Sequence, residues 1–199
     1  MCFIRGCINI IKSMFSYIYC MPILNTIIIL LSVCILWRIA CLKTEKKQAT
    51  RWRVFNFILF VIWMNCVCYM TIFIRGNAVN ETNLIPFHSI IDVLNGGNIE
   101  FLRVTWMNCL LFVPGSMWLN YSTSKQNYKK RVFQIIFFML ISIGIEFVQG
   151  YFKIGVVEVD DVIYNTFGAV IGNTADLWSE RLISITKYTI LKIKSIMIK

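Results

Sequence analysis

The sequence contains few charged residues for its length. Asp, Glu, Lys and Arg make up only 15% of the 199 residues, whereas hydrophobic residues make up 58%. In soluble globular domains about a quarter of the residues are charged and roughly half are apolar. The shortage of charge therefore argues against a soluble domain and predicts an integral membrane protein.

The usual residues of a metal or disulfide site are also scarce. The chain has one histidine, and no two of its eight cysteines form a C-x-x-C pair. Cysteine is small, soft and apolar, so cysteines within hydrophobic segments are expected to serve in packing. We predict no metal site and no cofactor.

The charges that are present are mainly positive, with 20 Lys and Arg against 10 Asp and Glu. In a soluble protein this excess would suggest nucleic acid as a partner. Here most of the basic residues lie between or after the hydrophobic segments, and no nucleic-acid recognition motif surrounds them. Positive loops on the cytoplasmic side of a membrane explain them, so the predicted partner is the lipid bilayer and not nucleic acid.

Five hydrophobic segments are long enough to cross a hydrocarbon layer of about 30 Å as helices. They are residues 22–42, 54–74, 104–121, 132–150 and 159–178. Shorter interfacial or amphipathic helices are predicted for residues 1–21, 84–91 and 179–199. The predicted fold is therefore an all-α membrane protein with about five transmembrane helices, in which residues 1–199 form a single domain.

The distribution of Lys and Arg predicts the orientation of the chain. If the link 43–53 is cytoplasmic, the link 122–131 and the C-terminal tail are cytoplasmic as well. With Arg38, these regions hold 15 of the 20 basic residues. The positive-inside rule then places the N-terminus outside and the C-terminus in the cytoplasm.

Polar residues within the predicted spans are the candidates for function, because they are expensive at membrane depth. In the predicted orientation they gather in the outer half of the third, fourth and fifth spans. They are Asn108, Glu146, Gln149, Asp160, Asp161 and Asn165. We predict a polar, net-negative cavity that opens outward, with Glu146 and Asp161 as its main acids.

Residue spacing supports a shared face. Asp161, Asn165, Gly168 and Gly172 follow at helical intervals, and the two glycines would let another helix approach closely. Pro114 and Gly115 predict a kink in the third span. The residues predicted to be structural are Pro86, Pro114, Gly115, Gly168 and Gly172.

The polar residues also have purely structural alternatives. Asp160 and Asp161 stand where acids cap the N-terminus of a helix, and Asp160 is expected to be the more exposed of the two. Glu146 could extend to the membrane surface or stay protonated between helices. Asn108 and Asn165 could simply join neighbouring helices by hydrogen bonds.

Four blocks of residues follow one another along the chain. They are Asn83-Leu84-Ile85-Pro86-Phe87, Asn108-x-x-Leu111-Phe112-x-Pro114-Gly115, Glu146-x-x-Gln149 and Val159-Asp160-Asp161-Val162-x-x-Asn165-Thr166-x-Gly168. Together they resemble the VanZ-like family over about residues 83–173. The last block is the most specific, and the order of all four strengthens the resemblance. The chain departs from many relatives before the Asp-Asp pair, where it has Glu158 in place of an aspartate and Lys153 as the nearest base.

The resemblance implies a protein of the bacterial plasma membrane. Some members of this family are linked to low-level resistance to glycopeptides of the teicoplanin type. The preferred hypothesis is an accessory protein that binds a lipid, an envelope precursor or the drug at the polar cavity. A second hypothesis is an enzyme in which Glu146 and Asp161 act as acid and base, or hold a divalent cation, on a lipid-linked substrate. A third is a small transporter, although five helices without an inverted repeat make a poor transport core.

Overall fold

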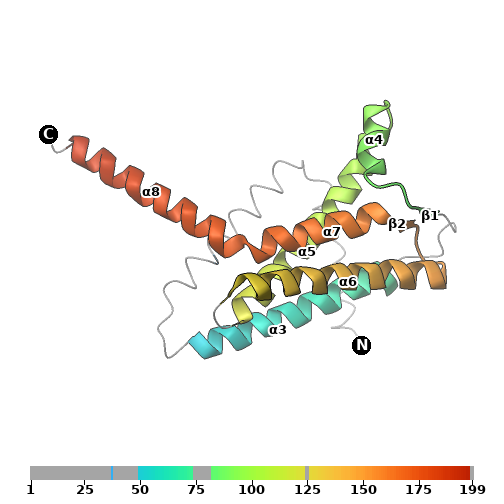
Figure 1. Cartoon of the computed structure of the whole chain (residues 1–199), viewed down its shortest axis with the longest axis horizontal. Coiled ribbons are helices and arrows are strands. Elements are labelled where there is room, and N and C mark those ends of the chain that lie inside the picture. The colour runs from blue at the N-terminus through green and yellow to red at the C-terminus, as the bar shows by residue number, and fades with distance from the viewer. Residues whose placement is uncertain (1–36, 38–48, 74–81, 124–125, 198–199) are drawn as a thin grey trace, which may run out of the picture. The chain divides into compact units, whose positions relative to one another are not determined.

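Six α-helices and one π-helical turn form most of the part of the chain that the structure describes (Figure 1). This computed structural model describes residues 37, 49–73, 82–123 and 126–197. The chain divides into the units Met1–Trp37 and Arg38–Lys199, and every described residue except Trp37 belongs to the second. The predicted segments 1–21 and 22–42 lie outside the described residues, apart from Trp37.

Two of the described helices are long and apolar enough to cross a membrane. One is α3 (Ala49–Cys68), continued by the π-helical turn η2 (Tyr69–Phe73), and the other is α6 (Tyr128–Phe152). Both cover segments that the sequence predicts as spans. Large apolar side chains point away from the protein along both helices, among them Ile58 and Ile62 on α3 and Leu140 and Phe147 on α6. A core helix of a soluble protein would bury such side chains, so these faces are compatible with contact with lipid.

The predicted third span is also helical, as part of α5 (Ile99–Ser122). The helix starts at Asn98, whose side chain accepts a hydrogen bond from the backbone N–H of Glu100. It continues through Pro114, which has no N–H to bond the preceding turn. In that turn the carbonyl of Leu111 accepts a hydrogen bond of 2.8 Å from the indole of Trp63 on α3.

The prediction of a fifth span over residues 159–178 is wrong in its extent. The helix α7 (Val159–Asn173) ends before Thr174, and a separate helix, α8 (Ala175–Met197), follows. The Thr174 hydroxyl bonds the carbonyl of Val170, which competes with helix continuation. At about 1.5 Å per residue, α7 reaches only about 22 Å, which is less than the hydrocarbon thickness. The described residues therefore do not show five spans.

The segment 84–91 also differs from the predicted interfacial helix. Only its second half is helical, in α4 (His88–Leu94), and the residues before it form a turn. Upstream, Thr82–Asn83 (β1) pairs in parallel with Val157–Glu158 (β2). This short sheet was not predicted, because two-residue strands leave no alternating pattern in the sequence.

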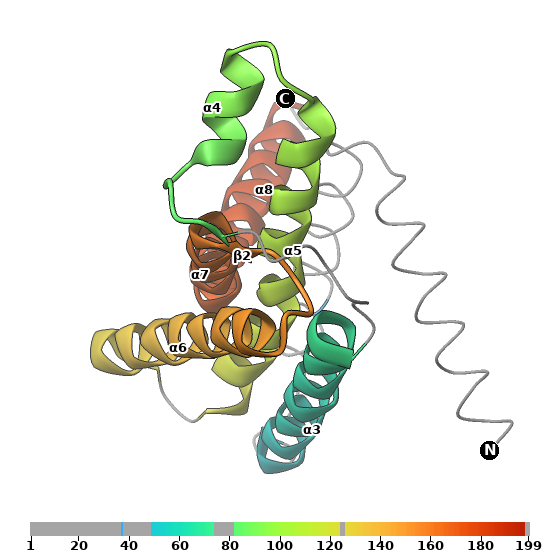
Figure 2. The same cartoon turned by 90° about the vertical axis from the view of Figure 1, so that its right-hand side faces the viewer.

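The closest packing joins α5 and α7, which cross in Figure 1 and lie side by side in Figure 2. Gly168 and Gly172 face α5 so closely that a Cβ atom would lie 1.9 Å from the Cys109 carbonyl oxygen or 2.2 Å from that of Val113. The Ser116 hydroxyl adds a 2.7 Å hydrogen bond to the Ala169 carbonyl. Small residues therefore let the two backbones touch.

A cluster of aromatic side chains holds α3 and α6 to this pair. Phe138 is fully buried and meets Phe60 and Phe112 edge to face, with ring centroids 6.0 Å apart in both pairs. Gly115 leaves room for Trp63, whose ring would lie 3.1 Å from a Cβ atom at that position. The core fixes the ends of α5, α6 and α7 relative to one another, and with them the polar residues described next.

Candidate functional site

All four sequence blocks meet at one end of α5, α6 and α7. The β1–β2 pairing places Asn83, from the first block, beside Glu158, which precedes the last block. Asn108 on α5 bonds Asp161 on α7, and Glu146 on α6 bonds the backbone of Glu158. Segments separated by up to about 80 residues therefore share one polar network.

Asp161 and Asn108 form a direct link between the side chains of α5 and α7. The Asn108 amide Nδ2 donates a 2.6 Å hydrogen bond to Asp161 Oδ1. Both side chains are buried, with 8% of Asn108 and 5% of Asp161 exposed. An aspartate can be held so deeply only because polar groups replace its water.

Glu146 and Gln149 lie in the last turns of α6 and connect it to two other segments. Glu146 Oε2 accepts a 2.9 Å hydrogen bond from the Glu158 N–H, at the entry to α7. Gln149 Nε2 donates a 3.0 Å bond to the Thr71 carbonyl in η2. The 3.6-residue repeat of α6 turns both side chains inward, where they are buried.

Asn165 lies one turn after Asp161 on α7, and one of its hydrogen-bond acceptors has no donor in the part of the chain that the structure describes. Its Nδ2 donates a 2.8 Å bond to the Ser142 hydroxyl on α6. Its Oδ1 is buried and has no partner among the described residues, although only 6% of the residue is exposed. A buried acceptor without a donor is costly, so this atom is a position at which a ligand or water donor would be stabilised.

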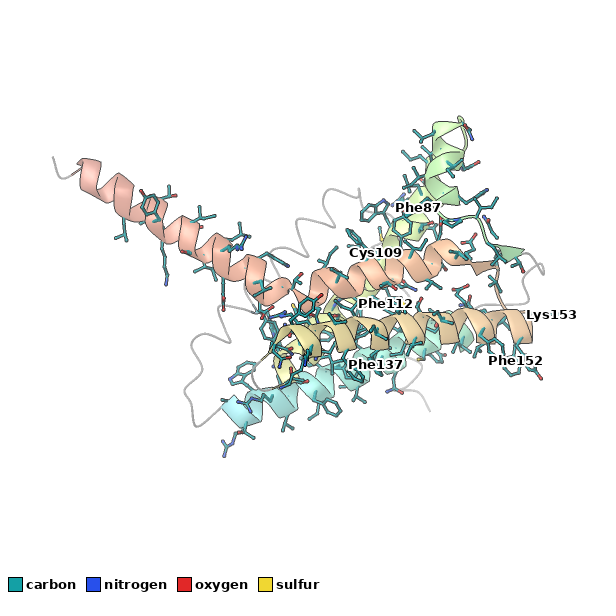
Figure 3. The ribbon with its side chains drawn as sticks, viewed as in Figure 1. Phe87, Cys109, Phe112, Phe137, Phe152 and Lys153 are labelled. Carbon is teal, nitrogen blue, oxygen red and sulfur yellow. The ribbon has the colours of Figure 1, made fainter. Side chains whose placement is uncertain are left out.

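Asp160 does not cap its own helix but holds the start of α4. Its Oδ1 accepts a 2.5 Å bond from the Phe87 N–H, and its Oδ2 accepts bonds from the Ser89 N–H and hydroxyl at 2.9 and 2.7 Å. Phe87 lies at the base of α4, above α7 (Figure 3), in a left-handed conformation with φ 59° that presents these groups to the carboxylate. Asp160 is 4% exposed, against 5% for Asp161, so the expectation that it is the more exposed acid is wrong.

Replacing Asp160 by asparagine should loosen α4. The amide keeps one acceptor but loses the negative charge and turns an N–H group toward the α4 donors, which costs about 1–2 kcal/mol. We expect hydrogen exchange in residues 84–94 to become about tenfold faster without a change in α6. The matched control is Asp92→Asn on α4 itself, which should leave exchange in both segments unchanged. Equal exchange in Asp160→Asn and wild type would show that the carboxylate does not hold α4.

The network combines anionic oxygens with amides and hydroxyls, so its chemistry is the recognition of hydrogen-bond donors or of cationic groups. Among the described residues, no group of three His, Cys, Asp or Glu side chains is arranged to hold a metal ion. The site residues are each less than 10% exposed. Among the predicted residues, Asn108 and Asp161 bond each other, and the others bond backbone groups or hydroxyls of neighbouring segments.

Several contributors to the network were missed in the sequence. Ser142 lies four residues before Glu146, so the helical spacing of α6 could have revealed it. Ser89 follows the first block by two residues, but no pattern indicates that its hydroxyl meets Asp160. The carbonyl of Thr71 and the N–H of Glu158 are backbone groups, which side-chain motifs cannot identify.

Comparison with known proteins supports the grouping of these blocks. A family model described as VanZ/LLP1 matches residues 26–175. No curated protein and no solved structure is significantly similar to the chain.

Proposed function

The chain belongs to the VanZ/LLP1 family, and from this premise we propose that it is an accessory membrane protein that lowers susceptibility to glycopeptides of the teicoplanin type. It acts by binding a lipid, an envelope precursor or the drug at the polar network formed by α5, α6 and α7. Glu146 and Asp161 are the main contacts, and Asn108, Gln149 and Asn165 orient the ligand. The observation that carries the proposal is the burial of both acids together with the unpartnered Asn165 Oδ1.

A multi-pass orientation in the bacterial plasma membrane is part of the proposal, with the N-terminus outside and the C-terminus in the cytoplasm. The two ends of the packed helices differ in charge. Asp160, Asp161 and Glu146 lie at one end, while Lys129, Lys130 and Arg131 lie at the start of α6, 15–17 residues before Glu146. The positive-inside rule assigns the basic end to the cytoplasm and the acidic end to the outer leaflet.

The neighbourhood of the network favours a ligand with a polar head and an apolar tail. Beside Asp160, the turn and helix before α5 expose a row of large apolar side chains. They are Leu84, Ile85, Phe87, Ile90, Ile91 and Leu94, with exposed fractions from 37% to 79%. Such a surface next to buried acids suits a lipid or a lipid-tailed molecule at the membrane interface.

The proposal is tested by measuring teicoplanin and vancomycin susceptibility in a sensitive Gram-positive host. Wild type should raise the inhibitory concentration of teicoplanin but not that of vancomycin. Glu146→Gln and Asp161→Asn keep the size of each side chain but remove its charge, so each should return the value to that of the empty vector. Membrane levels are compared by blotting, so that loss of protein is distinguished from loss of function.

The matched control is Glu100→Gln, the same chemical change at a surface residue whose side chain is 60% exposed. It should protect as well as wild type. If Glu146→Gln and Asp161→Asn also protect fully, the two acids are structural and the site assignment is wrong. If wild type gives no protection, the proposed resistance function is wrong.

A further inference from the structure

A second feature lies at the opposite end of the helices, far along α6 from the acidic network. An open groove of about 710 Å³ runs between α3, the end of α5 and the start of α6. Its walls are apolar side chains from all three helices: Phe57 and Phe60, Leu119, and Phe133 and Phe137. Its volume is within the usual range of small-molecule and lipid sites, about 300–1,000 Å³.

The groove is open toward the surroundings of the protein. Phe57 is 50% exposed and Phe133 71% exposed, so the outer rim of the groove consists of aromatic faces without full cover from the described residues. Deeper in, Phe60 and Phe137 approach with ring centroids 6.5 Å apart, and Figure 3 shows Phe137 on α6. Aromatic and aliphatic walls of this kind are suited to an acyl chain.

Positive charge lies at one edge of the groove and favours a ligand with an anionic head group. Lys129 and Lys130 line it in the first turn of α6, where no acidic residue is present. The helix dipole is positive at this end as well, so the lysines and the helix terminus together favour an anion at this edge of the groove. The Asn127 side chain caps the backbone N–H of Lys130 at 2.9 Å, which keeps this turn helical and holds the lysines beside the groove.

We propose that this groove binds an anionic phospholipid of the cytoplasmic leaflet, with an acyl chain against the phenylalanines and the phosphate beside Lys129 and Lys130. Anionic lipids are attracted to basic residues at the cytoplasmic surface of a membrane. Apolar walls alone would accept any lipid, so the lysines account for the preference for an anionic head group. The proposal goes beyond the function assigned to the acidic network and rests only on the proposed orientation, which places the basic end of the helices in the cytoplasm.

The experiment places a photocrosslinker in the groove of the full-length protein. Phe133→benzoylphenylalanine is compared with Phe147→benzoylphenylalanine, since both positions lie on α6 and both are 71% exposed. The proteins are reconstituted in nanodiscs with equal parts of phosphatidylglycerol and phosphatidylcholine that carry the same acyl chains. Mass spectrometry then gives the ratio of the two lipids in the adducts at each position.

We expect phosphatidylglycerol adducts to be enriched about threefold or more at position 133 and to follow the bulk ratio at position 147. Lys129→Gln combined with Lys130→Gln should return position 133 to the bulk ratio. Arg181→Gln combined with Lys187→Gln removes the same charge from α8 and should leave the enrichment intact.

Three results would overturn the proposal. One is a bulk lipid ratio at position 133 in the otherwise wild-type chain. Another is enrichment that survives the loss of both lysines. The last is an adduct to another segment of this chain, such as residues 22–42, in place of lipid, which would identify the groove as an intramolecular contact.

Discussion

Gly168→Ala should reduce the stability of the protein more than alanine at any other helical glycine that the structure describes. The new Cβ would lie 1.9 Å from the Cys109 carbonyl oxygen, 2.8 Å from the carbonyl carbon and 3.2 Å from Cα. All three are backbone atoms, so no side-chain rotation can relieve the clash, and α5 and α7 must move apart. We expect a loss of about 3 kcal/mol, at the upper end of the usual range for overpacking.

The loss should lower the apparent melting temperature in detergent by roughly 6–12 °C, given about 2–4 °C per kcal/mol for a chain of this size. Gly172→Ala, whose Cβ would lie 2.2 Å from the Val113 carbonyl oxygen, should behave in the same way. The control is Gly144→Ala on α6, where a Cβ atom meets nothing within 4 Å and alanine favours the helix. If Gly168→Ala has the same melting temperature as Gly144→Ala, the backbones of α5 and α7 are not in contact in the protein.

Arg131→Gln and Asp176→Asn should each cause the next largest loss of stability. The guanidinium of Arg131 meets the Asp176 carboxylate with two parallel bonds of 3.0 and 2.5 Å, and it also donates to the Asn173 carbonyl. These contacts join the start of α6 to the corner between α7 and α8. The two side chains are only 14% and 17% exposed, so removing either leaves its partner poorly hydrated.

We expect each single variant to lose about 2–3 kcal/mol, less than a fully buried pair because some solvent reaches both groups. The double variant should lose less than the sum of the two, and this coupling is measured by a double-mutant cycle on the melting temperature. Arg131→Lys should recover only part of the stability, because an ammonium cannot make the paired bonds. As a control, Glu100→Gln breaks the more exposed ion pair with Arg103 and should change stability by less than about 1 kcal/mol. Additive effects at Arg131 and Asp176 would contradict a direct interaction.

The end of the fifth predicted span could not be predicted from the sequence. The polar run Asn173-Thr174-Ala175-Asp176 interrupts the apolar segment 159–178, but it does not by itself fix the residue at which the helix ends. The break depends on Thr174 bonding its own helix and on Arg131, 42 residues earlier, bonding the Asn173 carbonyl. A sliding window detects apolar length but not a distant side chain that competes for a backbone group.

Asp160 gives a second example. Its position at the start of a helix suggested a local cap, and its neighbour Asp161 suggested a shared polar face. The structure assigns Asp160 to the backbone of α4 and Asp161 to Asn108. Two adjacent acids on a helix point about 100° apart, so their partners are decided by which elements pack on each side.

The helical character of the described chain, its two apolar helices of membrane-crossing length and its family could all be predicted from the sequence. These properties depend on composition, on the 3.6-residue repeat and on motif spacing, all of which are local along the chain. Which polar groups pair, where α7 ends, that β1 pairs with β2 and that a lysine-edged groove lies at the basic end became known only from the packing of the helices. Each of these depends on contacts between segments tens of residues apart, and such contacts are fixed by the packing of whole helices rather than by any local pattern.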